Sequence, residues 1–246
     1  MKLVRTILLT AILLTTLQST CNGQRRIMSL SAGMRFGGNL GSIHLTDRAY
    51  GIYQPSSSLF PQAGVWLQFR TPVGISLRPE ISYKGRGGTL TCRDVRYHLV
   101  ANTIDTRLCM QLDLYVARTM SSFYLVAAPA YVHTLGGHVD YSDDFSGELD
   151  MSLSASNFTD NDFELFCGAG FEFPIPGGGT TLLVSVEAGY NFTLADSFTD
   201  VERSGTLITL NHTDLSETPR GSRLFRGFEI AARVGIPFGR KLKILR

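Results

Sequence analysis

The segment Val73-Gly-Ile-Ser-Leu-Arg-Pro-Glu-Ile-Ser-Tyr-Lys84 contains the pattern on which the fold depends. Apolar residues occupy every second position from Val73 to Tyr83, and small or charged residues fill the positions between them. Because successive side chains of a β-strand point to opposite faces of a sheet, one face of this strand is apolar and the other is polar. The segment therefore predicts a strand that separates two different environments.

The same pattern recurs along the chain in segments of about ten residues, bounded by Gly, Pro, Asn, Asp or Ser. It predicts eight strands, at 27–38, 61–70, 73–84, 106–117, 122–133, 162–173, 181–192 and 224–238. The fifth segment is apolar on both faces, so its phase is left open, and we expect a bulge at its Pro129. In the other seven, the apolar faces hold 38 residues, none of them charged. With 23 Lys and Arg and 21 Asp and Glu among 246 residues, chance would place about seven charges there.

A face without charges fits a protein core or a lipid bilayer, in which a Lys or Arg at the midplane costs about 2–4 kcal/mol. The connections between the strands distinguish the two. They alternate between long (39–60, 85–105, 134–161 and 193–223) and short (71–72, 118–121 and 174–180). Bacterial membrane barrels pair short periplasmic turns with long outer loops in this way. The sequence therefore predicts an all-β fold, an antiparallel up-and-down transmembrane β-barrel of about eight strands with extracellular long loops.

Two details extend this prediction. In the predicted topology, the aromatic residues of the lipid face gather near the strand ends as two girdles. The outer girdle comprises Phe36, Tyr83, Phe163, Tyr190 and Phe192, and the inner one Phe69, Phe171, Phe173 and Phe238. Period-2 alternation also reappears inside two long loops, at Gly147–Leu153 and Thr206–Leu210, so we expect both segments to extend hairpins above the membrane.

The N-terminus predicts export. Lys2 and Arg5 precede an apolar run from Ile7 to Leu17, which is too short to span a bilayer as a helix and is typical of a secretory signal peptide. We expect residues 1–23 to be the signal peptide, 24–238 the outer-membrane β-barrel domain and 239–246 a basic C-terminal tail. Lipoprotein processing at Cys21 is the alternative. After Gln24 no apolar run reaches the length of a transmembrane helix, and the mean hydropathy of the whole chain is +0.07.

The polar faces of the predicted strands carry six basic and six acidic residues. A conducting or ligand-binding interior is one interpretation. The other is a structural network of ion pairs that fills a narrow barrel, since about eight strands leave room for little more than side chains. We prefer the structural interpretation. The predicted lumen charge network consists of Arg35, Arg70, Arg78, Glu80, Lys84, Arg107, Asp113, Glu164, Glu172, Glu187, Glu229 and Arg233.

Sites for chemistry are weakly indicated. The three mature cysteines, Cys92, Cys109 and Cys167, favour apolar filler positions, with a Cys92–Cys109 bridge as the alternative. The histidines, His44, His98, His133, His138 and His212, fall in or beside the outer loops. The nearest catalytic constellation is His138, Asp140, Ser142, Asp143 and Asp144, and a metal site would need His133, His138 and Asp140. Neither has the spacing of a known site, so we predict no catalytic residues, no metal and no cofactor.

Four segments of the predicted strands resemble a known family. Residues 74–85 (GISLRPEISYKG) resemble the third strand of the PorT-like family of outer-membrane β-barrel proteins, and residues 123–129 (FYLVAAP), 164–172 (ELFCGAGFE) and 186–191 (VEAGYN) are similar to later strands of that family. The chain departs from the family pattern at Ala128, where Gly is usual, and in its tail beyond Phe238. The resemblance implies an outer-membrane barrel of a Gram-negative bacterium, and some family members are linked to protein secretion and gliding.

Together these observations predict a non-enzymatic outer-membrane barrel with a filled lumen, which acts through its loops as a structural, adhesion or binding protein of the envelope. The alternatives are a soluble periplasmic β-barrel with an apolar ligand and a membrane-embedded hydrolase with loop His, Asp and Ser. The expected partners are outer-membrane lipid, the barrel-assembly machinery and an extracellular or envelope protein. The net charge of +2 indicates no particular partner, and the sequence has no basic block or aromatic-interleaved basic stripe that would indicate nucleic acid.

Overall fold

The structure is a computed structural model that describes residues 29–45, 54–92, 95–115, 121–143, 147–152, 161–177, 180–194 and 223–238. The predicted signal peptide and basic tail lie outside these residues, as does the expected hairpin extension at Thr206–Leu210. Within the described part of the chain, no helix has the length and apolar character needed to cross a membrane.

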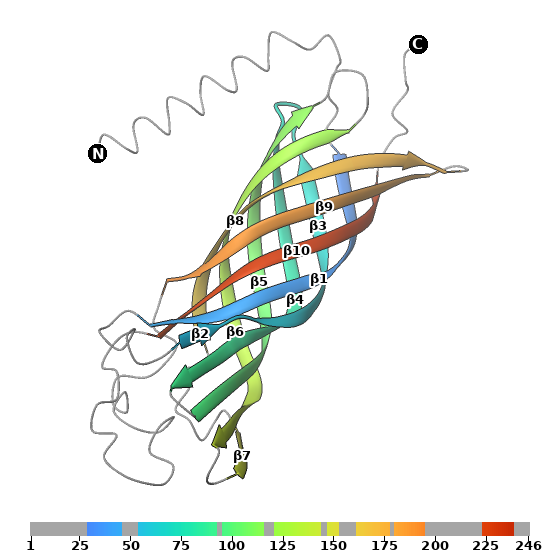
Figure 1. Cartoon of the computed structure of the whole chain (residues 1–246). Helices are drawn as coiled ribbons and strands as arrows, with labels where there is room; N and C mark the ends of the chain where they lie inside the picture. Colours follow the sequence, from blue (N-terminus) through green and yellow to red (C-terminus); the bar gives the residue numbers. More distant parts are fainter. Residues whose placement is uncertain are drawn as a thin grey trace, which may run out of the picture.

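Eight antiparallel strands form a closed barrel (Figure 1). Each strand pairs with its sequence neighbours, and β1 pairs with both β3 and β10, so no edge is left open among the eight. The fold class predicted from the sequence is confirmed. The barrel strands are β1 (Ser29–Leu45), β3 (Ser58–Arg70), β4 (Ile75–Cys92), β5 (Val95–Tyr115), β6 (Ser122–Asp143), β8 (Asn161–Pro176), β9 (Thr181–Thr193) and β10 (Arg223–Phe238).

The alternation of the sequence places apolar side chains outside and polar ones inside. In β3, Val65 is 55% exposed on the outer face, whereas its neighbour Trp66 is 4% exposed on the inner face. The buried residues of the barrel include most of its charged side chains, and the exposed outer belt includes large residues such as Met34, Ile81 and Ile230. This distribution is the reverse of a water-soluble protein, in which large apolar surfaces are buried. It defines a barrel whose outer surface faces lipid.

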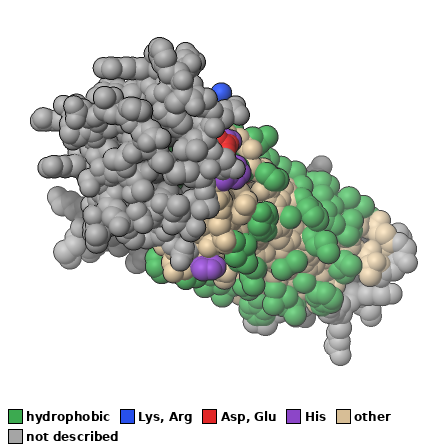
Figure 2. Space-filling view, turned by 90° about the horizontal axis from the view of Figure 1, so that it is seen from below, with side chains coloured by type: hydrophobic (Ala, Val, Ile, Leu, Met, Phe, Trp, Pro, Cys, Tyr) green, Lys and Arg blue, Asp and Glu red, His purple; other side chains and the backbone are tan. Residues whose placement is uncertain are grey.

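Aromatic residues occupy both ends of this belt. In the outer group, the rings of Tyr131 and Phe163 pack edge to face with centroids 5.5 Å apart. The ring centroids of Tyr190 and Phe192 lie 4.7 Å apart. In the inner group, Phe171 lies 6.2 Å from Phe173. Figure 2 shows the apolar belt as a band of green side chains.

The prediction of a long loop at 85–105 is wrong. Strand β4 continues to Cys92 and β5 begins at Val95, and the two remain paired in one register up to the contact of Cys92 with Val95. Two short strands add to this end of the barrel. β2 (Gln54–Ser56) pairs with β4, and β7 (Gly147–Ser152) pairs with β6, which confirms the expected extension at 147–153. The end of the barrel that carries these additions is called the outer end below (Figure 1).

The opposite, inner end has short connections. The turn after β3 spans Thr71–Gly74, in which the Thr71 amide donates to the Ile75 carbonyl at 2.9 Å and Gly74 adopts a φ of 85°. A positive φ favours Gly, which accounts for the residue type at position 74. Val73, predicted as a strand residue, lies in the same turn, because β4 begins at Ile75. At the β8–β9 turn the Gly177 amide donates to the Thr180 carbonyl at 2.9 Å.

Strand β6 differs from the sequence prediction in two ways. Its phase is now fixed, because Tyr124, Val126 and Ala128 are buried inside and Phe123 and Leu125 are exposed outside. The bulge expected at Pro129 is absent, because the β5–β6 register is the same on both sides of that residue and Pro129 pairs with Leu165 on β8.

The register shift of β6 lies further along, where Asn102 pairs with Gly136 and Thr103 with Thr134. Gly136 has a φ of 147°, in the region that favours Gly. Because of the extra residue, even-numbered residues of β6 beyond this point lie on the outward face instead of the inward one. His138, opposite Val100, and Asp140, opposite His98, therefore point outward.

Candidate functional site: the charged interior of the barrel

All twelve residues of the predicted lumen charge network lie on the inner face of the barrel. Eleven are buried, and Arg70, at the inner end, retains a side-chain exposure of 16%. Three further charged residues, Arg86, Asp105 and Asp162, belong to the same interior and were missed. The available signal was phase, because each lies two positions from a predicted member: Arg86 after Lys84, Asp105 before Arg107 and Asp162 before Glu164.

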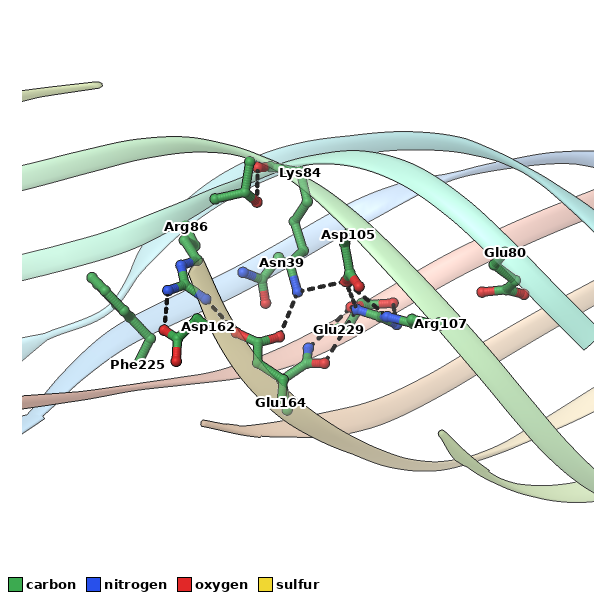
Figure 3. Close-up of polar contacts among 12 residues, drawn as sticks. Asn39, Glu80, Lys84, Arg86, Asp105, Arg107, Asp162, Glu164, Phe225 and Glu229 are labelled. Carbon is green, nitrogen blue, oxygen red and sulfur yellow. Dashed lines mark hydrogen bonds and ion pairs between the residues drawn. The ribbon is translucent and has the colours of Figure 1, made fainter. Parts of the chain in front are cut away.

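The outermost contacts join β4, β5 and β8 (Figure 3). Arg86 pairs with Asp162, and its Nη1 donates to Glu164 Oε1 at 2.8 Å. Lys84 Nζ lies 2.9 Å from Glu164 Oε2 and 3.0 Å from Asp105 Oδ2. Each of these two cations therefore contacts two carboxylates. The two that Lys84 contacts come from β5 and β8, which are not adjacent strands.

The next layer centres on Glu229 of β10. Arg107 Nη1 and Nη2 donate to the two Glu229 oxygens at 2.9 and 2.8 Å, an arrangement with the bidentate geometry that makes such pairs strong. Glu229 also accepts from Asn191 Nδ2 at 3.0 Å and pairs with Arg35. Arg107 in turn lies 2.6 Å from Asp105, which connects this layer to the outer one.

A third layer is built around Glu187 of β9. The Glu187 carboxylate oxygens lie 2.6 Å from Arg78 Nη2, 3.0 Å from Arg35 Nη1 and 3.8 Å from Arg233 Nη2. Glu80 contacts the first two of these arginines, at 2.5 Å for Arg78 and 2.8 Å for Arg35. Arg233 also donates to the Tyr124 hydroxyl at 2.6 Å. Three arginines and two glutamates thus share one buried site.

The innermost layer continues from Arg78 through an amide. Arg78 Nη1 donates to Gln111 Oε1 at 2.6 Å, and Gln111 Nε2 donates to Asp113 Oδ1 at 2.5 Å. Asp113 also accepts from Ser76 at 2.7 Å. Arg70 then joins Asp113, at 3.2 Å, to Glu172, at 2.7 Å.

Aromatic side chains fill the space between these layers. Phe166 lies under Arg107 and Arg35, with guanidinium carbons 4.8 and 5.9 Å from the ring centroid. Arg233 lies between the rings of Tyr124 and Trp66, at 5.1 and 5.6 Å. Trp66 Nε1 donates to the carbonyl of Met34 at 3.0 Å. These contacts are cation–π interactions, which are strongest where water is excluded.

Traced from contact to contact, the charged residues form one network that runs from Asp162 near the outer end to Glu172 near the inner end. In the described interior it contains seven cations (Arg35, Arg70, Arg78, Lys84, Arg86, Arg107 and Arg233) and eight carboxylates (Glu80, Asp105, Asp113, Asp162, Glu164, Glu172, Glu187 and Glu229). Near balance of opposite charges allows all of them to be buried as ions. The arrangement cross-links strands on opposite sides of the lumen.

The residues considered for catalysis or metal binding lie elsewhere. His98, His138 and Asp140 are on the outward face of the β5–β6 extension, where Asp140 Oδ2 lies 3.5 Å from His98 Nδ1 and 3.6 Å from His138 Nε2. His133 contacts Asn161 instead. His138, Asp140 and Ser142 are strand rather than loop residues, whereas Asp144 and His212 lie outside the described residues. Among the residues that the structure describes, no group of three or more His, Cys, Asp or Glu is placed to hold a metal ion.

Cys109 is buried in the lumen and free, and Cys167 is exposed and free. A bridge between Cys92 and Cys109 is therefore excluded. Burial among apolar groups agrees with the interpretation of Cys109 as a small apolar side chain, because it lies in a cluster with Tyr124, Val126, Ala128 and Phe166.

The closed antiparallel barrel, its apolar exterior and its charged interior define a transmembrane β-barrel of eight strands. Solved structures of similar architecture are outer-membrane proteins. Neisserial surface protein A is 10% identical with a TM-score of 0.42, covering 85% of this chain and 97% of that one. The outer membrane protein OprG from Pseudomonas aeruginosa is 9% identical with a TM-score of 0.48, covering 88% and 98%. The outer membrane protease OmpT from Escherichia coli is 10% identical with a TM-score of 0.40, covering 88% and 100%.

At these identities and TM-scores the similarities transfer no activity to this chain. No protein-family model and no curated protein sequence matches it. The resemblance to the PorT-like family therefore stays a prediction.

Proposed function

We propose that the protein is an exported outer-membrane barrel of the bacterial envelope that conducts no solute of useful size and acts through the surface of its outer end, as a structural, adhesion or binding protein. The observation that carries this proposal is the continuous network of buried ion pairs and aromatic rings across the lumen. An enzymatic role is not part of the proposal.

The filled lumen supports the absence of conduction. Large side chains such as Arg35, Arg78, Tyr124 and Phe166 are almost fully buried inside the barrel, and an eight-stranded barrel has little interior volume beyond its side chains. A solute that crossed would have to break several charge-assisted hydrogen bonds in a medium of low dielectric constant, each of which is stronger there than in water. The lumen therefore works as a structural core.

The same observation weakens the soluble alternative. A periplasmic barrel that holds an apolar ligand needs an apolar interior and a polar exterior, whereas this barrel buries its charges and exposes Leu, Ile, Val and Phe over its middle. The hydrolase alternative rests on His138, Asp140 and Ser142, whose side chains lie on the outward face of β6. Among the described residues, Asp140 contacts the imidazoles of His98 and His138, and neither imidazole contacts the Ser142 hydroxyl. Ligand binding at the outer end then remains as the role with the most surface available to it.

The proposal is tested in three steps. Cell fractionation should recover the protein in the outer membrane, and its gel mobility should change on heating, as expected for a folded barrel. The purified barrel should then give no stable open steps in a planar bilayer in which a porin, the positive control, does. Stable openings of porin size from the unmodified protein would overturn the proposal.

A pair of variants on β8 sharpens the conductance test. Phe166→Ala removes a ring that fills the lumen beneath Arg107 and Arg35, whereas Phe163→Ala removes a ring of the same type from the lipid face. If the side chains block the lumen, current leakage should rise in Phe166→Ala and not in Phe163→Ala. Heat-modifiable mobility of both variants shows that they are folded.

A further inference from the structure

The net charge of +2 conceals an uneven distribution of charge between the two ends of the barrel. At the inner end, the chain outside the strands comprises residues 24–28, which follow the expected signal peptide, residues 239–246 after β10, and the turns 71–74, 116–121 and 177–180. These segments contain seven basic residues and no Asp or Glu. The seven are called the basic rim below and are Arg25, Arg26, Arg118, Arg240, Lys241, Lys243 and Arg246.

The chain that joins the barrel strands at the outer end has the opposite charge. It comprises residues 46–57, 93–94, 144–160 and 194–222. Its four basic residues are Arg48, Arg93, Arg203 and Arg220. Its eleven acidic residues are Asp47, Asp94, Asp144, Glu148, Asp150, Asp160, Asp196, Asp200, Glu202, Asp214 and Glu217. The two ends of the barrel are therefore expected to prefer surroundings of different charge.

The charged lumen residues nearest to the basic rim change its charge little. Arg70 contacts Asp113 and Glu172, so these three side chains together contribute −1. The outward-facing side chains that the structure describes at the inner end carry no charge. Seven basic residues less this one negative charge leave a net side-chain charge of +6. Even with a free carboxylate at Arg246, this end of the barrel remains strongly basic.

The strand ends beside the basic rim lie at the level of the inner aromatic girdle. Strand β10 ends at Phe238, which is 54% exposed and pairs with Leu30, the second residue of β1. The turn 116–121 leads into β6 beside Phe123, which is 41% exposed and pairs with Phe171 of the same girdle. Aromatic girdles lie at the level of the lipid headgroups, so the segments that carry the rim start at that level.

Chain length keeps most of the basic rim close to the headgroups. Five of its members are within four residues of a described strand end, and therefore within about 14 Å of it even in a fully extended chain. These five are Arg25, Arg26, Arg118, Arg240 and Lys241. The last six residues, Lys241-Leu-Lys-Ile-Leu-Arg246, mix basic and apolar side chains, a composition that suits the membrane interface.

We propose that the basic rim binds the phosphate headgroups of anionic lipid in the leaflet at the inner end of the barrel. This inference rests on the proposed membrane insertion and is independent of the role proposed for the outer end. Lipid is the expected partner because the rim starts at the headgroup level and its segments contain no acidic side chain that competes for the cations. The acidic connections at the outer end repel the same lipid, so the attraction is confined to one leaflet.

The test uses the full barrel refolded in phosphatidylcholine vesicles, with traces of spin-labelled phosphatidylglycerol or spin-labelled phosphatidylcholine. The fraction of each label that the protein immobilises gives its preference for the anionic lipid. We expect phosphatidylglycerol to be preferred. Added salt should weaken the preference, because ions screen exposed charges.

A variant of the tail tests whether the basic rim causes the preference. Replacing the four basic residues after β10 (Arg240→Gln, Lys241→Gln, Lys243→Gln and Arg246→Gln) leaves three of the seven rim cations. The logarithm of the lipid preference should fall to about half, because each basic group near the surface contributes a similar share of the attraction.

Two control variants separate the position of the charges from their number and chemistry. The matched control replaces the four basic residues at the other end of the barrel (Arg48→Gln, Arg93→Gln, Arg203→Gln and Arg220→Gln) and should change the preference much less. Lys241→Arg with Lys243→Arg keeps the charge of the tail and should keep the preference of the unmodified protein.

Failure of the lipid inference gives a different result from failure of the proposed function. A protein whose gel mobility does not change on heating contradicts membrane insertion itself. A heat-modifiable barrel that immobilises the two lipids equally, or that loses as much preference in the matched control as in the tail variant, overturns the lipid inference alone. A preference that inorganic phosphate abolishes at constant ionic strength overturns lipid as the source of the phosphate group. Equal immobilisation together with cosedimentation of the barrel with purified peptidoglycan would assign the rim to the anionic cell wall instead.

Discussion

The carboxylate of Glu187 is shared by three lumen arginines, and replacing it with the amide of Gln tests whether the network stabilises the barrel. The variant Glu187→Gln keeps the size of the side chain and one oxygen that accepts hydrogen bonds. It removes the negative charge that Arg78, Arg35 and Arg233 face at 2.6, 3.0 and 3.8 Å. In the described part of the chain, Glu187 is the carboxylate that Arg233 contacts, so this arginine loses its ion pair.

The expected magnitude follows from the burial of the site. The side chains of Glu187 and Arg78 have an exposed fraction of 0%, and that of Arg233 is 1% exposed. Removing one partner of a buried ion pair costs about 3–5 kcal/mol, because a charge remains without compensation in a medium of low dielectric constant. Since the amide oxygen still accepts from Arg78, we expect a loss near the lower end, about 3 kcal/mol in the free energy of unfolding.

The measurement is urea unfolding of the barrel in lipid vesicles, followed by its gel mobility. Glu80→Gln is the matched control. It removes the same charge from the same site, but Arg35 keeps Glu187 and Glu229 and Arg78 keeps Glu187, so its cost should be smaller. Adding Arg233→Met to Glu187→Gln should recover part of the stability by removing the uncompensated cation.

Equal stability of the unmodified barrel and Glu187→Gln would refute this reasoning. So would a larger loss in Glu80→Gln than in Glu187→Gln, because the rank order follows from the number of carboxylates left to each arginine. An unchanged dependence of the free energy on urea concentration would show that the comparison concerns the same transition.

Three other predictions address the exterior and the topology. Val186→Arg places a cation on the lipid face and should cost about 2–4 kcal/mol near the midplane and impair membrane assembly, which fractionation measures; Arg tolerated there as well as on the inner face would indicate a water-soluble fold. Ser76→Ala removes one hydrogen bond to Asp113, which keeps Gln111 and Arg70, so it should cost only about 0.5–1.5 kcal/mol in urea unfolding. Protease added to intact cells should cut the connections after β1 and β9 and spare 71–74 and 177–180, and the opposite cleavage pattern would invert the proposed topology.

The fold was predictable from the sequence where the strands cross the apolar belt. There, one face meets lipid and the other meets the charged lumen, so hydrophobicity alternates with the period of a strand, as in residues 73–84. Beyond the belt this contrast disappears. The outward face of the β4–β5 hairpin carries His98 and Asn102, which are as polar as the residues of a loop. For this reason the sequence did not reveal that 85–105 is mostly strand.

The sequence predicted which charged residues face the lumen, but not which of them contact one another. Phase alone assigned twelve charged residues to the interior, and its extension by two positions would have added Arg86 and Asp105. The partners across the lumen depend on the tilt and stagger of the closed barrel, which strand periodicity does not contain. Arg35 and Glu187, for example, are separated by 152 residues in the chain and lie 3.0 Å apart.

Trp66 is the single tryptophan of the chain, and it lies in the lumen with 4% of its surface exposed. Its indole fluorescence therefore comes from one position inside the barrel. Quenchers carried on lipid chains reach the outer surface of a barrel, from which the wall formed by β3 separates the indole ring. Before the barrel closes, a chain adsorbed on the bilayer has no such wall, so the same quenchers should reduce its emission. Loss of lipid quenching during refolding would then time the closure of the barrel without any added label.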